Sequence, residues 1–371
     1  MRNIGVICIY LSILMAVFCT NVAAQSPVPT LNMSYIFTTH HTPLMVAAEK
    51  GELFKTTGAY LEEIVPKQRY SLKNVDGKEL AVFNLIVSKS GSETTTLFAM
   101  NKLDLGLASS TAFISGIDKG AAMKILCPLH VDGLSMVFPK DSDVNSYADL
   151  ERLVATAQHP VKIGYHSPTS APRVVFEGAL HEAGFTITGN PNNADADILM
   201  VDLKSTANLI PALVSGQVDA WVGPAPFPAV AEHRGAGHVG LDSRALPPAG
   251  QWTDFPCCVL GASEKVISEH PEVVQAVTNL LTAAADWSNS NPPASATISS
   301  AWIGVPAEAV AKSSIIFTTN PTESWLRGEG IFLSVLNEMD KLRGSMKDAE
   351  FKDVSPLLYD FSFIEKSLSA Q

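Results

Sequence analysis

Five short loops, each following a stretch that we expect to be a β-strand, hold the side chains best suited to binding a small anion. Four of the five are rich in Ser and Thr and lead into a predicted helix. Free N–H groups at a helix start and the helix dipole attract negative charge, and hydroxyls add hydrogen-bond donors. Ligands of open parallel sheets bind beyond the carboxyl ends of the strands, so we expect these loops to converge. The residues in them that we predict to bind ligand are Thr39, His40, His41, Thr42, Ser88, Ser90, Gly91, Ser92, Ser109, Ser110, Thr111, Ser167, Thr169, Ser170 and Phe227.

Each loop taken alone has a simpler explanation, which is ordinary helix capping. Arg173 lies in the first turn of a predicted helix, where the dipole disfavours a cation, so a bound carboxylate, sulfonate or phosphate would explain its position. A solvated Arg173, or one paired with Glu177 a turn later, explains it equally well. His40 and His41 could donate to a ligand, bind a metal or be plain loop residues. Because no third metal ligand lies near them in the sequence, we predict no metal site.

The first 24 residues have the pattern of a secretory signal peptide. Arg2 precedes an apolar run, residues 4–18, that is too short to span a membrane. Small residues then lead to Ala24, after which we predict cleavage and export to the periplasm. We expect no lipid anchor at Cys19, because the bulky Phe18 before it does not suit lipidation.

Three cysteines would remain in the exported chain, namely Cys127, Cys257 and Cys258. An odd number argues against a dense disulfide framework. Free buried thiols are favoured over a vicinal disulfide between Cys257 and Cys258. The spacing of the three cysteines is not that of a zinc site.

Composition and motifs argue against several classes of function. A formal net charge of −11 does not suit a nucleic-acid-binding protein. The chain has no G-x-S-x-G, no H-E-x-x-H and no Walker-type phosphate loop, and we find no convincing catalytic arrangement. Asp104 and Asp219 lie at matching strand positions, where a structural role is favoured. We therefore predict a protein that binds and releases its ligand, without a cofactor and without catalysis.

One helix–turn–strand unit occurs twice in the chain. Residues 97–111 read LFAMNKLDLGLASST, and residues 213–229 read LVSGQVDAWVGPAPFPA. In the second copy Gly216 follows a helix and prolines stop the strand. Strands alternate with helices through the first two-thirds of the sequence, and long helical segments follow. We predict an α/β protein with mainly parallel sheets, helices on both faces, and two similar lobes with the ligand between them.

Ordered motifs along the chain resemble those of a known family. They are VAAEKGELF at 46–54, LFAMNKLDLGLASSTAFISGIDKG at 97–120, SMVFPKDSDVNSYADLE at 135–151, LVSGQVDAWVGPAPFPA at 213–229 and SEKVISEHPEVVQAV at 263–277. In these the chain resembles the type II periplasmic substrate-binding proteins of ABC importers, in the group for nitrate, sulfonates, taurine and thiamine-pyrimidine precursors. The resemblance covers essentially the whole mature chain and implies two lobes joined by two crossing hinge strands.

The resemblance also implies domain boundaries. It places lobe I at residues 31–131 and 226–371 and lobe II at 132–225, with crossings near 130–134 and 223–227. The hinge residues would be Asp132, Gly133, Gly223 and Pro224, and we add His130, at the first crossing, to the predicted ligand-binding residues. Departures from the family pattern, at His40-His41, at 67–78 and at 255–258, put the ligand rather than the fold in question. The stretch at 67–78 is charged and turn-like, and we interpret it as a surface excursion.

The function that the resemblance implies is capture of a small anionic or zwitterionic solute. The partners would be the permease and ATPase subunits of an importer, and the protein would be a monomer. A sulfonate, nitrate, a pyrimidine or an aromatic acid all suit the predicted loops. Two alternatives remain open: an enzyme similar to the thiamine-pyrimidine synthases, which use a His and a cysteine-rich loop, and a ligand-sensing module.

Overall fold

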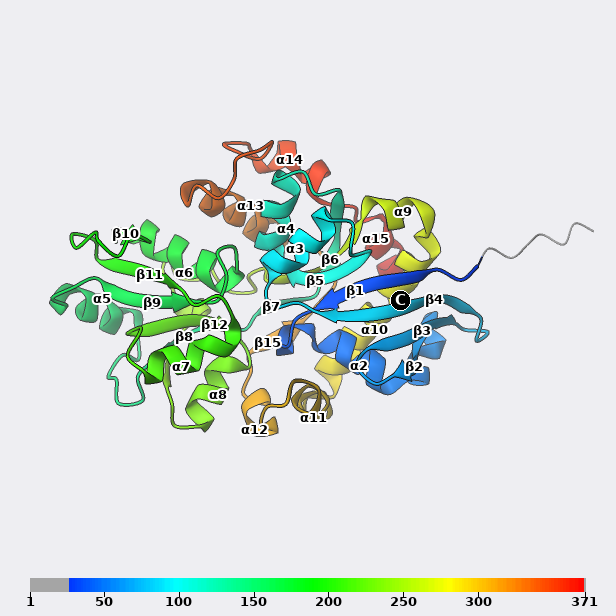
Figure 1. Ribbon diagram of the computed structural model, residues 1–371, viewed down its shortest axis with the longest axis horizontal. Helices are drawn as coiled ribbons and strands as arrows, with labels where there is room; N and C mark the ends of the chain where they lie inside the picture. The colour runs from blue at the N-terminus through cyan, green and yellow to red at the C-terminus, as the bar shows by residue number, and fades with distance from the viewer. Residues whose placement is uncertain (1–26, 370–371) are drawn as a thin grey trace, which may run out of the picture.

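Two β-sheets, one in each half of the molecule, organise residues 27–369, which are the residues that the computed structural model describes (Figure 1). Strands and helices alternate along the chain, and helices cover both faces of the sheets. The predicted two-lobed α/β fold is confirmed. The predicted signal peptide, residues 1–24 with Cys19, lies outside the described residues. Within the described part of the chain, no helix has the length and apolar character needed to cross a membrane.

The first lobe is built on a seven-stranded sheet with the order β2-β3-β4-β1-β5-β14-β6. Its centre is parallel, because β1 runs in the same direction as β4 and β5. The late strand β14 inserts antiparallel between β5 and β6, which brings distant parts of the chain together. The strands are β1 (Thr30–Tyr35), β2 (Ala59–Val65), β3 (Arg69–Asn74), β4 (Glu79–Val87), β5 (Leu105–Ser109), β6 (Met123–Pro128) and β14 (Cys258–Ser263).

The charged stretch at 67–78, which we interpreted as a surface excursion, is instead the hairpin strand β3. It pairs antiparallel with both β2 and β4. Tyr70 and Leu72 are buried in the core of the first lobe while Arg69 is exposed. The interpretation as a loop was wrong because the charges of this stretch masked its period-2 alternation.

The second lobe has a six-stranded sheet with the order β10-β11-β9-β12-β8-β13. Strands β9, β11 and β12 are parallel, while β8 runs antiparallel to β12 and β13. Gly223 and Pro224 are paired inside this sheet with Ser135 and Leu134. The strands are β8 (Leu134–Phe138), β9 (Val161–Tyr165), β10 (Ile187–Thr188), β11 (Ile198–Asp202), β12 (Ala220–Pro224) and β13 (His238–Asp242).

This pairing moves the return of the chain away from its expected place. Because β13 belongs to the second sheet, the second lobe extends past residue 225, and Gly223 and Pro224 are sheet residues rather than a crossing. The chain returns to the first lobe between β13 and β14. There the Phe255 N–H donates to Asp132 Oδ1 at 3.1 Å, and the Asp132 N–H donates to the Phe255 carbonyl at 3.1 Å.

The outward crossing lies where it was expected. Strand β7 (His130–Asp132) pairs with β15 (Ile315–Phe317) and leads through Asp132 and Gly133, which both have positive φ, into β8. Such φ values suit glycine and are uncommon for aspartate, so this turn is a special backbone position. That it acts as a hinge stays a prediction.

Helices of the C-terminal third pack mainly on the first lobe. Helix α10 lies against α2, and α13 lies between α4 and α6 and so touches both lobes (Figure 1). The helices are α2 (Thr42–Lys50), α3 (Gly91–Ala99), α4 (Ser110–Asp118), α5 (Tyr147–Thr156), α6 (Ala171–Glu182), α7 (Leu209–Val214), α8 (Phe227–His233), α9 (Glu264–Glu269), α10 (Pro271–Ser290), α11 (Pro292–Ile303), α12 (Ala307–Val310), α13 (Glu323–Glu338), α14 (Phe351–Leu358) and α15 (Ser362–Ser369), with short 3-10 helices at Thr39–His41, Gly51–Thr57, Thr206–Asn208 and Ser243–Ala245.

Candidate functional site

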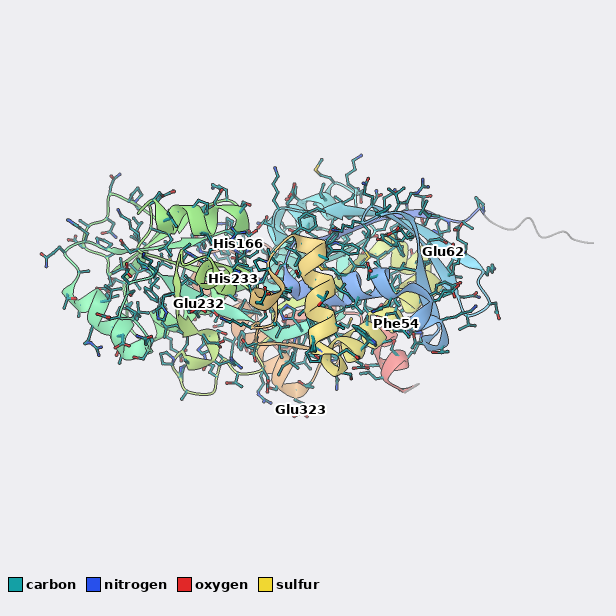
Figure 2. All side chains as sticks on the ribbon, turned by 90° about the horizontal axis from the view of Figure 1, so that it is seen from below. Phe54, Glu62, His166, Glu232, His233 and Glu323 are labelled. Atoms are coloured by element: carbon teal, nitrogen blue, oxygen red, sulfur yellow. The ribbon has the colours of Figure 1, made fainter. Side chains whose placement is uncertain are left out.

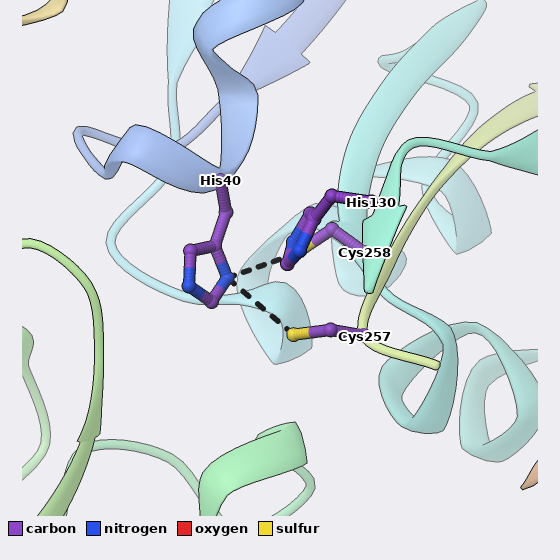
Figure 3. Close-up of side chains that lie close together, drawn as sticks. All are labelled: His40, His130, Cys257 and Cys258. Atoms are coloured by element: carbon purple, nitrogen blue, oxygen red, sulfur yellow. Dashed lines mark hydrogen bonds between the residues drawn. The ribbon is translucent and has the colours of Figure 1, made fainter. Parts of the chain in front are cut away.

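Four buried side chains of types that can ligate a metal, from three separate segments, meet at the face of the first lobe that adjoins the second (Figure 3). His40 comes from the 3-10 helix that follows β1, and His130 is the first residue of β7. Cys257 and Cys258 end the return crossing and begin β14. One nitrogen or sulfur from each of the four lies within 4.8 Å of the others. The fold thus assembles a cluster that sequence spacing did not indicate.

The geometry of His40 fixes which of its ring nitrogens is free. Nε2 lies 3.1 Å from the Gly133 carbonyl, which can only accept, so Nε2 carries the proton. Nδ1 is then unprotonated, and its lone pair lies 3.4 Å from Cys257 Sγ and 3.7 Å from Cys258 Sγ. Figure 3 shows the ring directed at both sulfurs.

His130 shows the same pattern with its nitrogens exchanged. Its Nδ1 lies 3.3 Å from the Val131 carbonyl, so the proton is on Nδ1. Nε2 is buried and has no hydrogen-bond partner among the residues that the structure describes. The ring centroids of His130 and His40 are 4.1 Å apart. A buried lone pair without a partner is costly, so this nitrogen needs an explanation.

His41 is oriented differently from its neighbour. The Ile36 N–H donates to His41 Nδ1 at 2.9 Å, so Nε2 of His41 carries the proton and is a donor. His41 therefore cannot offer Nε2 to a metal in this tautomer. Of the two adjacent histidines, only His40 presents a lone pair to the cysteines.

The thiols are free and buried, as predicted, and the backbone holds the pair in place. The Ser110 N–H donates to the Cys257 carbonyl at 2.8 Å, and the Leu129 N–H donates to the Cys258 carbonyl at 2.9 Å. Burial would raise the pKa of the Cys258 thiol, but the hydrogen bond from Cys257 leads the interactions that outweigh burial and hold that pKa well below its usual value. Burial and the negative charge of its neighbour raise the pKa of Cys257.

Two buried histidines of this region, His40 and His166, have lowered pKa values. Burial, followed by the positive charge that His130 would carry, lowers the pKa of His40 to about 4. His166, which follows β9 in the second lobe, has a pKa lowered to about 4 by burial and then by His40. Its Nδ1 is buried and, within residues 27–369, has no hydrogen-bond partner. Figure 2 shows His166 near the boundary of the two lobes.

Hydroxyl groups of the predicted loops do converge, and they bond directly across the two lobes. Ser92 Oγ lies 2.9 Å from Ser167 Oγ and 3.0 Å from Thr169 Oγ1. Thr111 Oγ1 donates to the Thr169 carbonyl at 2.7 Å, and Ser109 Oγ donates to it at 3.4 Å. The structure is therefore a closed arrangement of the lobes. That these residues contact a ligand stays a prediction.

Other predicted residues have partners within one lobe. Ser110 Oγ donates to Glu329, and Arg173 pairs with Glu177 at 2.7 Å while its guanidinium lies over Tyr165. Arg173 is thus engaged by the alternative partner that the sequence suggested. The remaining side chains act locally: Ser90 caps α3, Thr42 bonds Thr39 and Ser299, Ser170 bonds the Ser167 carbonyl, Thr39 and Ser88 have buried hydroxyls without partners, and Phe227 starts α8.

A small cavity of about 30 Å³ separates the histidine–cysteine cluster from the second lobe. This volume suits a single ion or about one or two water molecules. Sequence reasoning missed Thr38, His166, Cys257 and Cys258 as site residues. The signal that could have found Cys257 and Cys258 is their unusual position in the resemblance, but no spacing rule links them to His40 and His130. The cavity is lined by Ile36, Thr38, His40, Gly91, Ser109, His166, Ser170, Ala171, Pro172, Thr206, Pro224, Cys257 and Cys258.

Residues 24–304, which are more than half of the chain, match the model of the NMT1-like family. The chain belongs to the NMT1-like family. It is 31% identical over 116 residues to an uncharacterised protein of Methanocaldococcus jannaschii, a match that covers 31% of this chain and 80% of the relative.

Solved structures of low sequence identity share the fold of this NMT1-like protein. The nitrate-binding protein NrtA of Synechocystis superposes with a TM-score of 0.69 at 16% identity, covering 93% of this chain and 89% of NrtA. The ligand-binding component of an ABC-type import system from Staphylococcus aureus, solved with zinc bound, gives 0.68 at 14% identity, covering 91% and 99%. The alkanesulfonate-binding protein SsuA of Xanthomonas axonopodis gives 0.63 at 14% identity, covering 89% and 98%. The fold is that of periplasmic substrate-binding proteins.

Proposed function

We propose that this protein is the exported solute-binding component of an ABC importer. It would hold a small solute between its lobes and present the closed form, as a monomer, to the permease and ATPase subunits. The predicted periplasmic location follows from the signal-peptide pattern. The proposal is supported by membership of the NMT1-like family and by the fold shared with binding components of importers.

The observation that carries the proposal is the set of hydrogen bonds that span the lobes beside a small cavity. Ser92 meets Ser167 and Thr169, and Thr38 Oγ1 donates to the Ala225 carbonyl at 2.6 Å. Such contacts exist only when the lobes are together, so a solute that bridges them shifts the population to the closed form. A membrane partner can then distinguish loaded from empty protein.

From the sequence we expected the solute to be a small anion or zwitterion. The structure supports this expectation only in part. Arg173, the expected cation for it, is occupied by Glu177 and Tyr165. The hydroxyls of Ser92, Ser109 and Thr111 bond the second lobe in this closed form, and a small polar solute between the lobes would take the place of those bonds.

Small-angle X-ray scattering combined with thermal unfolding tests this function. Nitrate, an alkanesulfonate and an aminopyrimidine are added separately as probes. A probe at about 100 times its dissociation constant adds roughly 2.7 kcal/mol to the free energy of unfolding. We expect the probe that stabilises the protein to reduce its radius of gyration as well. A probe that stabilises the protein without any compaction would contradict closure of the two lobes around the solute.

The enzyme alternative gains one observation, because His40 lies against Cys257 and Cys258. A His beside a cysteine pair is the combination that the resemblance to thiamine-pyrimidine synthases implies. An intact-mass measurement separates the two functions. A chain whose histidine is modified or consumed after turnover favours the enzyme, whereas an unchanged chain that releases a small molecule on unfolding favours the importer component.

A further inference from the structure

We propose that His40, His130, Cys257 and Cys258 form a binding site for one thiophilic d10 metal ion, the chemistry shared by Zn²⁺ and Cu⁺. Thiolates and imidazoles are the ligands that both ions prefer, and a mixed set of two nitrogens and two sulfurs suits tetrahedral coordination. All four side chains are buried and converge from three chain segments.

The distances between the ligand atoms match a tetrahedron around such an ion. With metal–nitrogen bonds of about 2.0 Å and metal–sulfur bonds of about 2.3 Å, a tetrahedral edge from nitrogen to sulfur is about 3.5 Å long. His40 Nδ1 lies 3.4 Å from Cys257 Sγ and 3.7 Å from Cys258 Sγ. Two of the six edges are therefore already at coordination spacing, and all four ligand atoms lie within 4.8 Å of one another.

The outer hydrogen bonds of both histidines are those of metal ligands. A ligating histidine usually donates its other ring N–H to a carbonyl or carboxylate, which fixes the tautomer and the ring. His40 does so to Gly133 and His130 does so to Val131. His130 Nε2 consequently holds a buried lone pair with no partner, which a metal ion would satisfy.

The neighbouring His41 differs from His40 in which ring nitrogen is available. It is equally buried and only one residue away, yet the Ile36 N–H occupies its Nδ1 at 2.9 Å. The adjacent pair therefore contains one residue whose lone pair faces the sulfurs and one whose lone pair is taken by the backbone, with its Nε2 buried and without a partner among the described residues.

The site lies on the floor of the cavity between the lobes and is complete without the second lobe. His166 lines the same cavity from the second lobe, with its Nδ1 buried and unpartnered. In the closed form His166 would cover the ion. This last step rests on the proposed importer function and makes the ion, alone or in a complex, the enclosed solute. Binding of the ion itself does not depend on that function.

Cobalt substitution tests the site directly. The full chain is purified with reductant, stripped with a chelator and titrated anaerobically with Co²⁺. We expect one equivalent per chain, with the d–d absorption of tetrahedral Co²⁺ and thiolate-to-cobalt charge-transfer bands. Added Zn²⁺ should displace the cobalt. Competition with a chromophoric chelator for Zn²⁺, and with bicinchoninate for Cu⁺, distinguishes the two ions and gives their affinities.

Matched variants separate ligands from bystanders. The double variant Cys257→Ser and Cys258→Ser, and the single variant His40→Ala, should lose more affinity than the about 10- to 100-fold that removal of an outer hydrogen-bond partner costs. Cys127→Ser is the thiol control, because Cys127 is buried and free but outside the cluster. His159→Ala, at an exposed position, is the histidine control. Both controls should keep one equivalent of Co²⁺ with unchanged spectra.

Several results would overturn the proposal. They are Co²⁺ spectra of the wild-type chain without thiolate charge transfer, stoichiometric binding that persists in the cysteine double variant, or a Cys257–Cys258 disulfide in anaerobically purified protein. Scattering separates this failure from that of the importer function. Compaction with an organic probe and no metal binding would refute the metal site alone. A bound ion without compaction would keep the site but refute the ion as the enclosed solute.

Discussion

The repeated helix–turn–strand units of the two lobes are alike where their strands begin and different where they end. In the first lobe Asp104 Oδ2 accepts the Asn32 N–H at 2.8 Å, and in the second Asp219 Oδ2 accepts the Lys162 N–H at 2.8 Å. Each aspartate thus fixes the start of a central strand to its parallel neighbour. The shared part of the repeat is scaffold.

The exits of the two strands differ in the groups that they bring to the cleft. Strand β5 ends in Ser109 and continues into α4, and its hydroxyls bond the opposite lobe. Strand β12 ends in Pro224 and offers the Ala225 carbonyl to Thr38. The comparison teaches that a duplicated unit can keep its structural contact while its exits carry different chemistry.

Glu329 supports the end of β5 and not that of β12. Its substitution should have the largest effect on the free energy of unfolding. It is fully buried on α13, and its carboxyl binds Ser110, the first residue of α4, and the Tyr359 hydroxyl. Burial raises its pKa from 4.5 to about 7, although both hydrogen bonds lower it. Because the folded state keeps a proton that the unfolded chain releases, this group's contribution to stability is complete below pH 4.5 and is lost as pH rises towards 7. Its size is about 3 kcal/mol.

The variant Glu329→Gln should remove this pH dependence. Its free energy of unfolding in urea should equal that of the wild type near pH 4 and exceed it by about 3 kcal/mol near pH 8. Glu338→Gln, at an exposed position of the same helix, is the control and should shift neither end of the profile. A difference between wild type and Glu329→Gln that does not vary with pH would show that the carboxyl is not buried in its neutral form.

Substitution of the aspartates that the two units share should have the next largest effect on the free energy of unfolding. Asp104→Ala and Asp219→Ala each leave a strand N–H without its carboxylate acceptor, at a cost of about 1 kcal/mol. The loss should be larger for Asp104, which is the more buried of the two. Urea unfolding measures both. The Asp→Asn variants keep an acceptor and should be close to neutral. An Asn variant as unstable as the Ala variant would assign the effect to charge rather than to the hydrogen bond.

The sequence predicted most of the fold because the pattern of each element is local. The apolar strands, the helix starts and the repeat at Asp104 and Asp219 depend on residues a few positions apart. The boundary at residue 225 was wrong because it depended on the partner of β13, and strand pairing is not local. Proline at 224 and 226 suggested an exit from the sheet, whereas Pro224 ends a strand that is still paired with β8.

The cleft was predicted only in part for the same reason. The loops with Ser92, Ser109 and Thr111 follow from the rule that strand ends gather at one sheet edge. The contact of His40 with Cys257 and Cys258 requires β14 to pair beside β5, over a sequence separation of about 150 residues. Spacing rules for metal sites apply to ligands that are close together in the sequence. They therefore could not find a cluster made of His40, His130 and the cysteine pair.

Removing the hydroxyl contact between the lobes should have the smallest effect of the three changes. It tests directly whether the groups at the ends of β5 and β12 hold the lobes together. Ser92→Ala removes the group that meets both Ser167 Oγ and Thr169 Oγ1. A net hydrogen bond contributes about 1 kcal/mol, so the open form should gain about fivefold in population relative to the closed form. Distances between spin labels on α3 and α6, measured by pulsed electron resonance without ligand, report that population. Thr96→Ala is the control, because Thr96 Oγ1 donates to the Ser92 carbonyl within α3 and does not reach the other lobe. If Ser92→Ala leaves the distance distribution unchanged, the hydroxyls at the β5 side do not hold the lobes together, and the closed form depends on the Thr38 contact at the β12 exit.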